Sequence, residues 1–247
     1  MFRSQAKPQA IVVFADGACT GNPGPGGWGS IIATPTGEVK ELGGAQSPTT
    51  NNQMELTAVG KALLALEATP GVVHIYTDST YVIYGITKWV WGWRKNGWKT
   101  KEGGDVANAE YWKRLMAILA KRDKNDIVEW KYVRGHTGVP GNERVDEIAV
   151  SFAKGRPVSL YTGALLKYGV PIFDIPEDTS PPELRKREAP KAAYSYLSLV
   201  AGVPLRHKTW KECEGRVKGV PGAKFKKCMS GEDEDVLLES WGVKGKI

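Results

Sequence analysis

The sequence predicts an α/β fold, in which helices cover a mixed β-sheet, followed by a small α+β module. Three observations predict it. Residues 9–45 alternate short apolar runs with Gly- and Pro-containing turns, which is typical of three strands joined by tight turns. Residues 50–155 then alternate between helical and strand patterns. After a stretch rich in proline and charge, a second patterned segment begins near Tyr194.

Each element is predicted from its own pattern. Leu56, Val59, Leu63 and Leu66 recur at helical spacing, which predicts an amphipathic helix within residues 50–68. The same reading predicts a strand over 72–77, a helical segment over 78–86, a helix over 111–122, a strand over 126–133 and a helix over 142–155. Strands followed by alternating helices and strands predict a mixed sheet.

The chain divides by composition into three regions. Residues 1–155 carry the α/β pattern. Residues 156–193 are expected to form an extension, whose part around 161–175 packs as an appendage, and a linker rich in proline and charge. Residues 194–247 are expected to form a small module, because about 50 residues bury only a small core.

Composition points to a basic intracellular protein. The 247 residues carry a formal net charge of +7, which favours an anionic partner, with nucleic acid as the first candidate. The three cysteines contain no C-x-x-C pair, which argues against a disulfide framework or a zinc site. No apolar run approaches membrane-spanning length and the first residues lack a signal-peptide core. We therefore expect a cytoplasmic protein without a membrane partner.

A G-x-G-x-x-G spacing at Gly24, Gly26 and Gly29 follows an apolar run, as in dinucleotide-binding loops. That fingerprint requires a helix after the glycines, and Pro35 and Gly37 leave no room for one. The glycines are therefore assigned to a hairpin.

Four carboxylates lie where elements of an α/β sheet converge: Asp16 and Asp78 at strand ends, Glu55 near a helix start, and Asp146 one turn into the last helix. Carboxylates forced together repel, so such a cluster normally holds hard cations. Taken singly, each is equally an ordinary turn or helix-start acid.

The chain resembles a known family at this point. The segments "FADGACTGNPGPGGWG", "TTNNQMEL", "YTDSTYVIYGITKWVWGWRKNGWKT" and "VRGHTGVPGNERVDEIA" resemble, in order, the four signature blocks of type 1 ribonuclease H. The match covers residues 10 to about 155. It implies a five-stranded mixed sheet with helices on both faces. It also implies endonucleolytic cleavage of the RNA strand of RNA–DNA hybrids.

The resemblance assigns a metal-dependent mechanism. It implies that two Mg²⁺ ions, for which Mn²⁺ can substitute, are bound by Asp16, Glu55, Asp78 and Asp146, with Asp16 as the shared ligand. The products would carry 5′-phosphate and 3′-hydroxyl ends. His136 matches the mobile histidine of the family, which serves proton transfer or product release; the alternative is a solvated loop histidine.

Substrate contacts are implied in the same way. Asn22, Asn51 and Asn52 match residues that contact the minor groove and ribose hydroxyls, although Asn51 or Asn52 could instead cap the helix. Thr50 and Asn108 match a pocket for a DNA-strand phosphate. The glycines around Asn22 are expected to keep side chains clear of the duplex.

The segment 88–101, "KWVWGWRKNGWKTK", resembles the family's basic protrusion. Trp89 and Trp93 match positions that pack on deoxyribose, and the cations are expected to contact phosphates. Trp91 is expected to be a core residue. Thr80 departs from the glutamine common in relatives, so the contact made by that glutamine is not expected here.

The C-terminal segment "TWKECEGRVKGVPGAKFKKC" resembles the hybrid-binding, or viroplasmin-like, domain that usually precedes the nuclease in eukaryotic relatives. Residues matching its nucleic-acid contacts are Trp210, Phe225, Lys226 and Lys227. Double-stranded RNA is a second ligand to consider. Alternatively, Trp210 and Phe225 form the core of the module.

Three readings of function stay open at this stage. The leading one is an active nuclease whose C-terminal module aids hybrid binding. The others are a noncatalytic hybrid-binding protein and an active nuclease whose module binds a protein partner. A related integrase or transposase is disfavoured, because nothing in the sequence indicates joining of target DNA.

Overall fold

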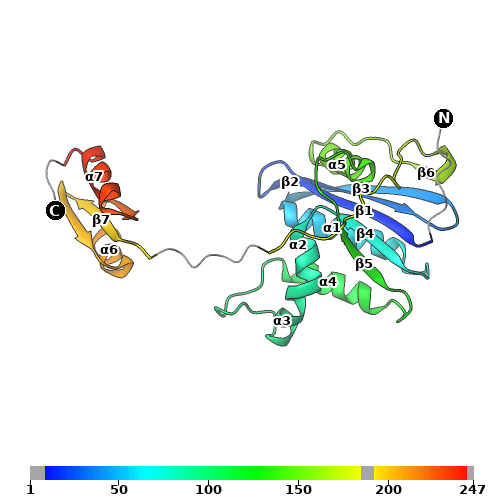
Figure 1. The fold of residues 1–247 in the computed structure, drawn as a ribbon, viewed down its shortest axis with the longest axis horizontal. Coiled ribbons are helices and arrows are strands. Elements are labelled where there is room, and N and C mark those ends of the chain that lie inside the picture. The colour runs from blue at the N-terminus through cyan, green and yellow to red at the C-terminus, as the bar shows by residue number, and fades with distance from the viewer. Residues whose placement is uncertain (1–8, 185–191, 244–247) are drawn as a thin grey trace. The chain divides into compact units, whose positions relative to one another are not determined.

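The structure, a computed structural model, describes residues 9–184 and 192–243 (Figure 1). The chain forms two compact units that divide between Glu183 and Leu184. Residues 156–183 therefore belong to the first unit. Within them, Leu165, Tyr168 and Ile172 are buried in the core of that unit.

The first unit is built on a six-stranded sheet in the order β5-β4-β1-β2-β3-β6. Strands β4 and β5 run parallel to β1, and the remaining neighbours are antiparallel. The five strands implied by the resemblance are present, and β6 adds a sixth from the extension. Their bounds are β1 Ile11–Cys19, β2 Gly24–Ala33, β3 Glu38–Thr49, β4 Val73–Thr77, β5 Val128–Tyr132 and β6 Thr162–Ala164.

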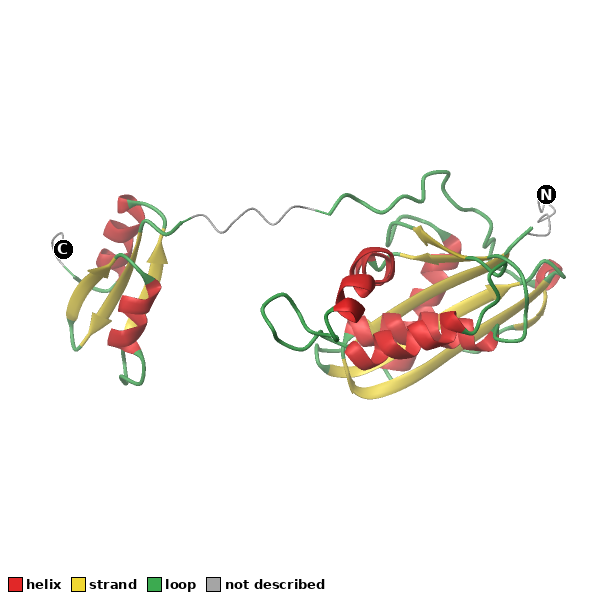
Figure 2. Cartoon of the chain, turned by 90° about the horizontal axis from the view of Figure 1, so that it is seen from below, coloured by secondary structure: helices red, strands yellow, loops and turns green. Residues whose placement is uncertain are grey.

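Helices cover both faces of this sheet, with α5 on one face and α1 and α4 on the other (Figures 1 and 2). The helical segment expected over 78–86 is longer, because a π-helical stretch joins α2 to α3. Within residues 9–184 and 192–243 no helix is long and apolar enough to cross a membrane. The bounds are α1 Asn51–Ala65, α2 Thr80–Tyr84, η1 (π-helical) Gly85–Trp89, α3 Val90–Lys95, α4 Ala109–Ala120, α5 Pro140–Ala153 and η2 (3₁₀) Leu165–Lys167.

Strand β1 is buried on both faces and contributes to two cores. Ile11, Val13 and Ala15 pack with α1 and α4, whereas Val12 and Phe14 pack on the α5 side. Successive side chains of a strand point to opposite faces, so a strand that is buried on both faces needs apolar residues at successive positions. This explains why β1 appears in the sequence as a continuous apolar run.

The glycines of the G-x-G-x-x-G region belong to strand β2, as the hairpin assignment predicts. Gly27 and Gly29 have a packing role that the sequence analysis did not predict. A Cβ atom on Gly27 would lie 2.1 Å from the carbonyl oxygen of Ala149, and one on Gly29 would lie 2.5 Å from that of Val145. Gly27 and Gly29 therefore allow α5 to pack directly on the sheet backbone.

The second unit is a three-stranded antiparallel sheet in the order β8-β7-β9, with two helices. Its bounds are β7 Ser195–Val200, β8 Val203–His207, α6 Trp210–Val217, β9 Lys224–Cys228 and α7 Gly231–Ser240. A capping box between Thr209 and Glu212 begins α6. The buried core is small, as expected for this length, and contains Leu197, Cys228, Leu237 and Leu238.

The close contact between α5 and β2 predicts opposite effects for two glycine-to-alanine changes. Gly27→Ala must displace α5 and should cost about 1–3 kcal/mol of stability. Gly60→Ala, inside α1 with its nearest neighbouring atom 4.0 Å away, should instead stabilise by about 0.5–1 kcal/mol. Urea unfolding of the full-length protein measures both. Equal effects would contradict the role given to Gly27.

Candidate active site

The register of the parallel strands brings two of the predicted carboxylates together. Phe14 on β1 lies opposite Tyr76 on β4. Asp16 and Asp78 each follow two residues later, so both lie at the same edge of the sheet. Asp16 itself pairs with Gly29 on β2, under the α5 helix that carries Asp146.

Glu55 reaches the same edge because α1 begins very close to β1. A Cβ atom on Gly17 would lie 2.2 Å from the backbone nitrogen of Glu55, so only glycine permits this approach. Asn51 Nδ2 donates a 2.9 Å hydrogen bond to Glu55 Oε1, and Ser79 Oγ donates to Glu55 Oε2. The Glu55 carboxylate is thereby oriented from two sides. Ser79 was missed by the sequence analysis, although it directly follows Asp78.

The electrostatics of Asp16 show that the carboxylates share one location. Asp16 is 7% exposed. Burial, followed by the negative charges of Asp78, Asp146 and Glu55, raises its pKa to about 8 against an opposing hydrogen bond from the Gly17 backbone N–H. Burial likewise raises the pKa of Glu55, and the charge of Asp78 adds to this effect. Such a site favours a proton or a cation.

A hydrated divalent cation fits these residues better than a closed protein cage does. Among residues 9–184 and 192–243, no three His, Cys, Asp or Glu side chains form a group that could hold an ion by themselves. Mg²⁺ usually keeps several waters and takes one or two carboxylates together with substrate phosphates. The buried Oδ1 of Asn142 has no hydrogen-bond partner, while its Nδ2 donates to Asp78 Oδ2 at 3.2 Å. Asn142 Oδ1 therefore offers a further oxygen beside Asp78 for a bound water.

His136 lies in the exposed loop between β5 and α5 and has a left-handed backbone, with φ of 54°. Burial raises the pKa of Asp146, and the nearby His136 charge opposes that rise. His136 is therefore near enough to Asp146 for its charge to act on that carboxyl.

The expected substrate residues cluster around the start of α1. Thr50 is the N-cap, since its side chain accepts a hydrogen bond from Gln53 N at 3.4 Å, so the alternative that Asn51 or Asn52 caps the helix is wrong. Gln53 Nε2 also donates to Asn108 Oδ1 at 3.1 Å, so Gln53 links Thr50 to Asn108. Asn52 is half-buried in the first turn.

Asn22 and Thr80 are two further residues of the predicted substrate region. Asn22 is exposed in the turn between β1 and β2. Thr80 is the half-buried first residue of α2, directly after the Ser79 cap.

The tryptophans of the protrusion have different environments. Trp89 and Trp93 are half-buried with ring centres 5.9 Å apart, and Trp93 packs on Trp112. Trp91 is 58% exposed, so its assignment to the core is wrong. Residue 91 lies on α3 one residue after the buried Val90, and the helix turns its side chain outward.

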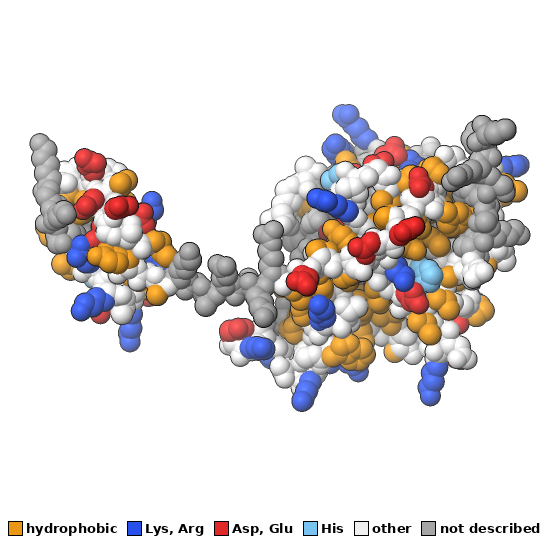
Figure 3. All heavy atoms as spheres, viewed as in Figure 1, with side chains coloured by type: hydrophobic (Ala, Val, Ile, Leu, Met, Phe, Trp, Pro, Cys, Tyr) orange, Lys and Arg blue, Asp and Glu red, His pale blue; other side chains and the backbone are white. Residues whose placement is uncertain are grey.

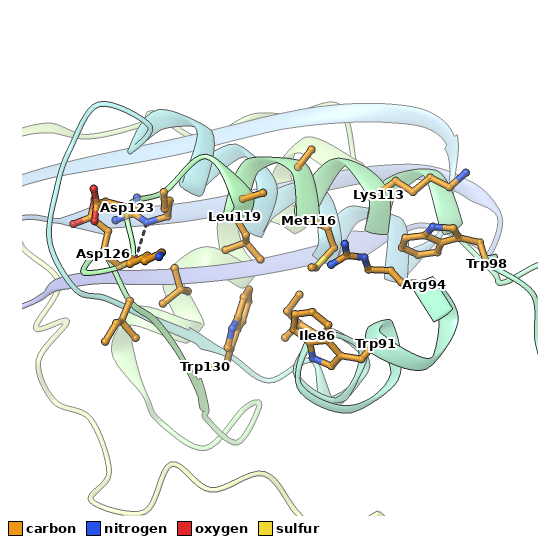
Figure 4. A pocket seen from close by; sticks show the side chains of 16 residues that line it. Ile86, Trp91, Arg94, Trp98, Lys113, Met116, Leu119, Asp123, Asp126 and Trp130 are labelled. Carbon is orange, nitrogen blue, oxygen red and sulfur yellow. Dashed lines mark hydrogen bonds between the residues drawn. The ribbon is translucent and has the colours of Figure 1, made fainter. Parts of the chain in front are cut away.

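Trp91 lines a groove of about 670 Å³ between α3, α4 and β5 (Figure 4). The guanidinium of Arg94 lies 5.7 Å from the Trp91 ring centre, and Lys113 lies 5.8 Å from that of Trp98. None of the four carboxylates lines the groove. It is therefore separate from the candidate active site.

The second unit exposes the aromatic residues predicted there. Trp210 and Phe225 are 41% and 51% exposed with ring centres 5.4 Å apart, so the alternative that they form the core is wrong. Tyr196, which was missed, packs on Trp210 at 5.8 Å. Lys226 and Lys227 are both exposed but point to opposite faces, because neighbouring strand residues alternate.

Comparisons with known proteins agree with this arrangement. The family model described as RNase H matches residues 8–154 and does not extend to the second unit. The ribonuclease H of Polaromonas naphthalenivorans is 49% identical over 144 residues, 58% of this chain and 87% of that protein. That of Rhizobium johnstonii is 51% identical over 155 residues, 60% of this chain and 97% of that protein.

A solved structure is similar as well. The crystal structure of LC9-RNase H1, described as a type 1 RNase H with the type 2 active-site motif, is 33% identical with a TM-score of 0.53. The match covers 63% of this chain and 78% of that one.

The raised pKa of Asp16 predicts a pH-dependent stability in the absence of divalent cations. Near neutral pH the folded protein retains a proton that the unfolded chain releases at its ordinary pKa of 3.8. Stability should therefore fall as pH rises from about 4 to about 8. Asp16→Asn cannot ionise, so its stability advantage over the wild type should grow across that range.

Urea unfolding of both proteins in EDTA, from about pH 5 to pH 9, measures this difference. Adding Mg²⁺ to the wild type is the matched control, and it should narrow the gap by stabilising the ionised form. If the stability of the two proteins in EDTA changed with pH in parallel, the raised pKa of Asp16 would be contradicted.

Proposed function

The chain belongs to the ribonuclease H family and hydrolyses the RNA strand of RNA–DNA hybrids, and we propose that it does so with Mg²⁺ held by Asp16, Glu55, Asp78 and Asp146. The observation that carries this assignment is the convergence of these carboxylates around the buried Asp16, whose pKa the other three raise. When bound, two Mg²⁺ ions would activate the attacking water and stabilise the leaving 3′ oxygen.

The environment of each carboxylate supports a distinct role. Asp16 is the most buried and interacts electrostatically with the other three, as expected for the ligand that both ions share. Glu55 is oriented by its two hydrogen-bond donors. Asp78 is oriented by Asn142. Such hydrogen bonds hold ligands in the geometry that a metal requires.

His136 is proposed to transfer a proton at the side of the site defined by Asp146. An imidazole can both donate and accept a proton, so it can protonate a leaving oxygen and later pass a proton to solvent. Its exposed loop position leaves it free to follow the product out of the site.

Recognition of RNA is proposed to act through the same end of α1. Asn51 donates from Nδ2 to Glu55, so its Oδ1 is left to accept a hydrogen bond from a ribose 2′-hydroxyl. Asn22 and Asn52 would add further polar contacts in the minor groove. Because Asn51 touches both the ribose and Glu55, binding of RNA would be coupled to the geometry of the site.

The DNA strand is proposed to lie across the pocket of Thr50 and Asn108 and along the protrusion. There the half-buried faces of Trp89 and Trp93 would pack on deoxyribose. Lys and Arg side chains project from both units on the face seen in Figure 3, and their phosphate contacts would weaken with salt.

The second unit is proposed to bind the hybrid as well, through Tyr196, Trp210, Phe225 and Lys227. Exposed aromatic rings beside lysines form a surface on which sugars and bases can pack. Tethering it to the nuclease would raise the local substrate concentration. The family membership and the four retained carboxylates argue against a noncatalytic hybrid-binding protein. A protein or duplex-RNA ligand for the second unit remains the competing assignment for that unit.

Cleavage of an RNA–DNA hybrid with each strand labelled in turn tests the catalytic assignment. We expect Mg²⁺-dependent cutting of the RNA strand only, with 5′-phosphate and 3′-hydroxyl ends. Asp16→Asn should lower activity by at least about 10³-fold, because the shared ligand is lost. Asp235→Asn, on the second unit, is the control and should retain activity. Cutting of the DNA strand, or full activity of Asp16→Asn, would overturn the proposal.

Replacing both Trp210 and Phe225 by alanine tests the role of the second unit. Loss of base or sugar packing is worth about 1–3 kcal/mol per ring. We therefore expect at least a tenfold rise in Kd for the hybrid in a binding assay, while the rate at saturating substrate is unchanged. Val236→Ala, a 67% exposed position on α7, is the matched control. Unchanged hybrid binding would favour the protein partner, and a selective loss of duplex-RNA binding would favour that ligand.

A further inference from the structure

Residues 156–183, here called the strap, lie beyond the family match yet cross the α5 face of the sheet from edge to edge. At one edge, β6 pairs with β3 through Thr162, Gly163 and Ala164. At the other, the carbonyl oxygen of Thr179 accepts a 2.8 Å hydrogen bond from the backbone N–H of Tyr132 on β5. The strap thus forms the outermost strand beside β3 and is hydrogen-bonded to β5, the outermost strand on the other side of the six-stranded sheet.

A buried ion pair between the sheet and α5 depends on the strap. The Glu41 carboxylate on β3 has a fully buried side chain and accepts two hydrogen bonds from Arg144 on α5, at 2.8 and 2.9 Å. The strap supplies the other two donors, the Tyr168 hydroxyl at 2.6 Å and the Tyr161 backbone N–H at 2.9 Å. Removing one donor from a buried carboxylate leaves that charge incompletely satisfied. The strap therefore helps to hold α5 on the sheet.

The same segment closes the apolar layer beneath two of the candidate metal ligands. Phe14 and Tyr76, which stack with ring centres 5.1 Å apart, belong to one buried cluster with Ile172 of the strap. Asp16 and Asp78 stand two residues beyond these rings on the same strands. A displacement of this layer would move both carboxylates.

The loop of His136 and the start of α5 rest on that cluster too. Val133 and Val139, which flank the loop, are buried in it. Val145, directly before Asp146, is a further member. Of the five candidate catalytic residues, Glu55 alone approaches from the opposite face, on α1.

We propose that the strap is a positioning element of the catalytic unit, which sets the geometry of Asp16, Asp78 and Asp146 through Tyr168 and Ile172. The inference rests on the proposed function, since it takes these carboxylates as the Mg²⁺ ligands. Tyr168 and Ile172 are positioning residues, because they act through Glu41, Arg144 and the buried rings and contact no reacting atom.

The test compares Tyr168→Phe and Ile172→Ala with Leu115→Ala in the full-length protein. Leu115 is buried like Ile172, but it lies on α4, in the core on the other face of the sheet. Helix α4 carries none of the four carboxylates. Urea unfolding first establishes how much stability each variant has lost. Mg²⁺ affinity is then measured twice, by calorimetric titration without substrate and from the Mg²⁺ concentration that gives half-maximal cleavage.

Both strap variants should bind Mg²⁺ about tenfold more weakly than the wild type, with KM for the hybrid at saturating Mg²⁺ unchanged. Leu115→Ala should keep wild-type Mg²⁺ affinity despite its loss of stability. Wild-type affinity in both strap variants would overturn the inference, as would an equal loss in Leu115→Ala, which would indicate general destabilisation. If Ile172→Ala does not fold, the milder Tyr168→Phe decides by the same criteria.

Asp16→Asn separates this inference from the proposed function. If that variant binds Mg²⁺ and cleaves like the wild type, the proposed ligands are wrong. If it loses both while the strap variants resemble the wild type, only the positioning role fails.

Discussion

Mutual repulsion among Asp16, Glu55, Asp78 and Asp146 is the constraint on which the first unit depends. Burial of Asp16, together with the negative charges of the other three, raises the pKa of Asp16 to about 8 and opposes folding of the ionised form. The surrounding structure must supply the energy that keeps the carboxylates in place without a cation. Packing on both faces of the sheet supplies it, since β1 and its neighbours are buried on each side.

Close backbone packing gives the site its precision. Gly17 lets α1 approach β1 and so brings Glu55 to Asp16, while Gly27 and Gly29 let α5 lie directly on β2. The ion pair between Arg144 and Glu41, which the strap covers, further limits movement of α5 against the sheet. The cluster of acids needs this rigidity, because its like charges would otherwise push the elements apart.

The two units differ in how they can meet nucleic acid. In the function proposed above, the first presents polar side chains around a buried acidic centre, where contacts to the ribose and to the scissile phosphate would coincide. The second, with a core of only a few residues, exposes Trp210 and Phe225, and the half-buried Tyr196 packs against Trp210 on the same face. A surface of that kind favours tolerant packing on sugars and bases over chemistry. The hybrid binding proposed for the second unit would complement cleavage by the first if both act on one duplex.

The sequence by itself determined the strand and helix types, the four carboxylates and the family, because local patterns and ordered motifs are written along the chain. It also determined that Gly24, Gly26 and Gly29 lie in a hairpin, since Pro35 and Gly37 exclude the helix of a nucleotide-binding loop. Only the tertiary structure decided how these parts meet. The reason the glycines are needed and the exposure of Trp91 both depend on neighbours distant in sequence. The strap shows this most directly. The sequence predicted that residues 156–193 form an extension and a linker, but it did not show that the Tyr168 hydroxyl donates a hydrogen bond to Glu41, 127 residues earlier.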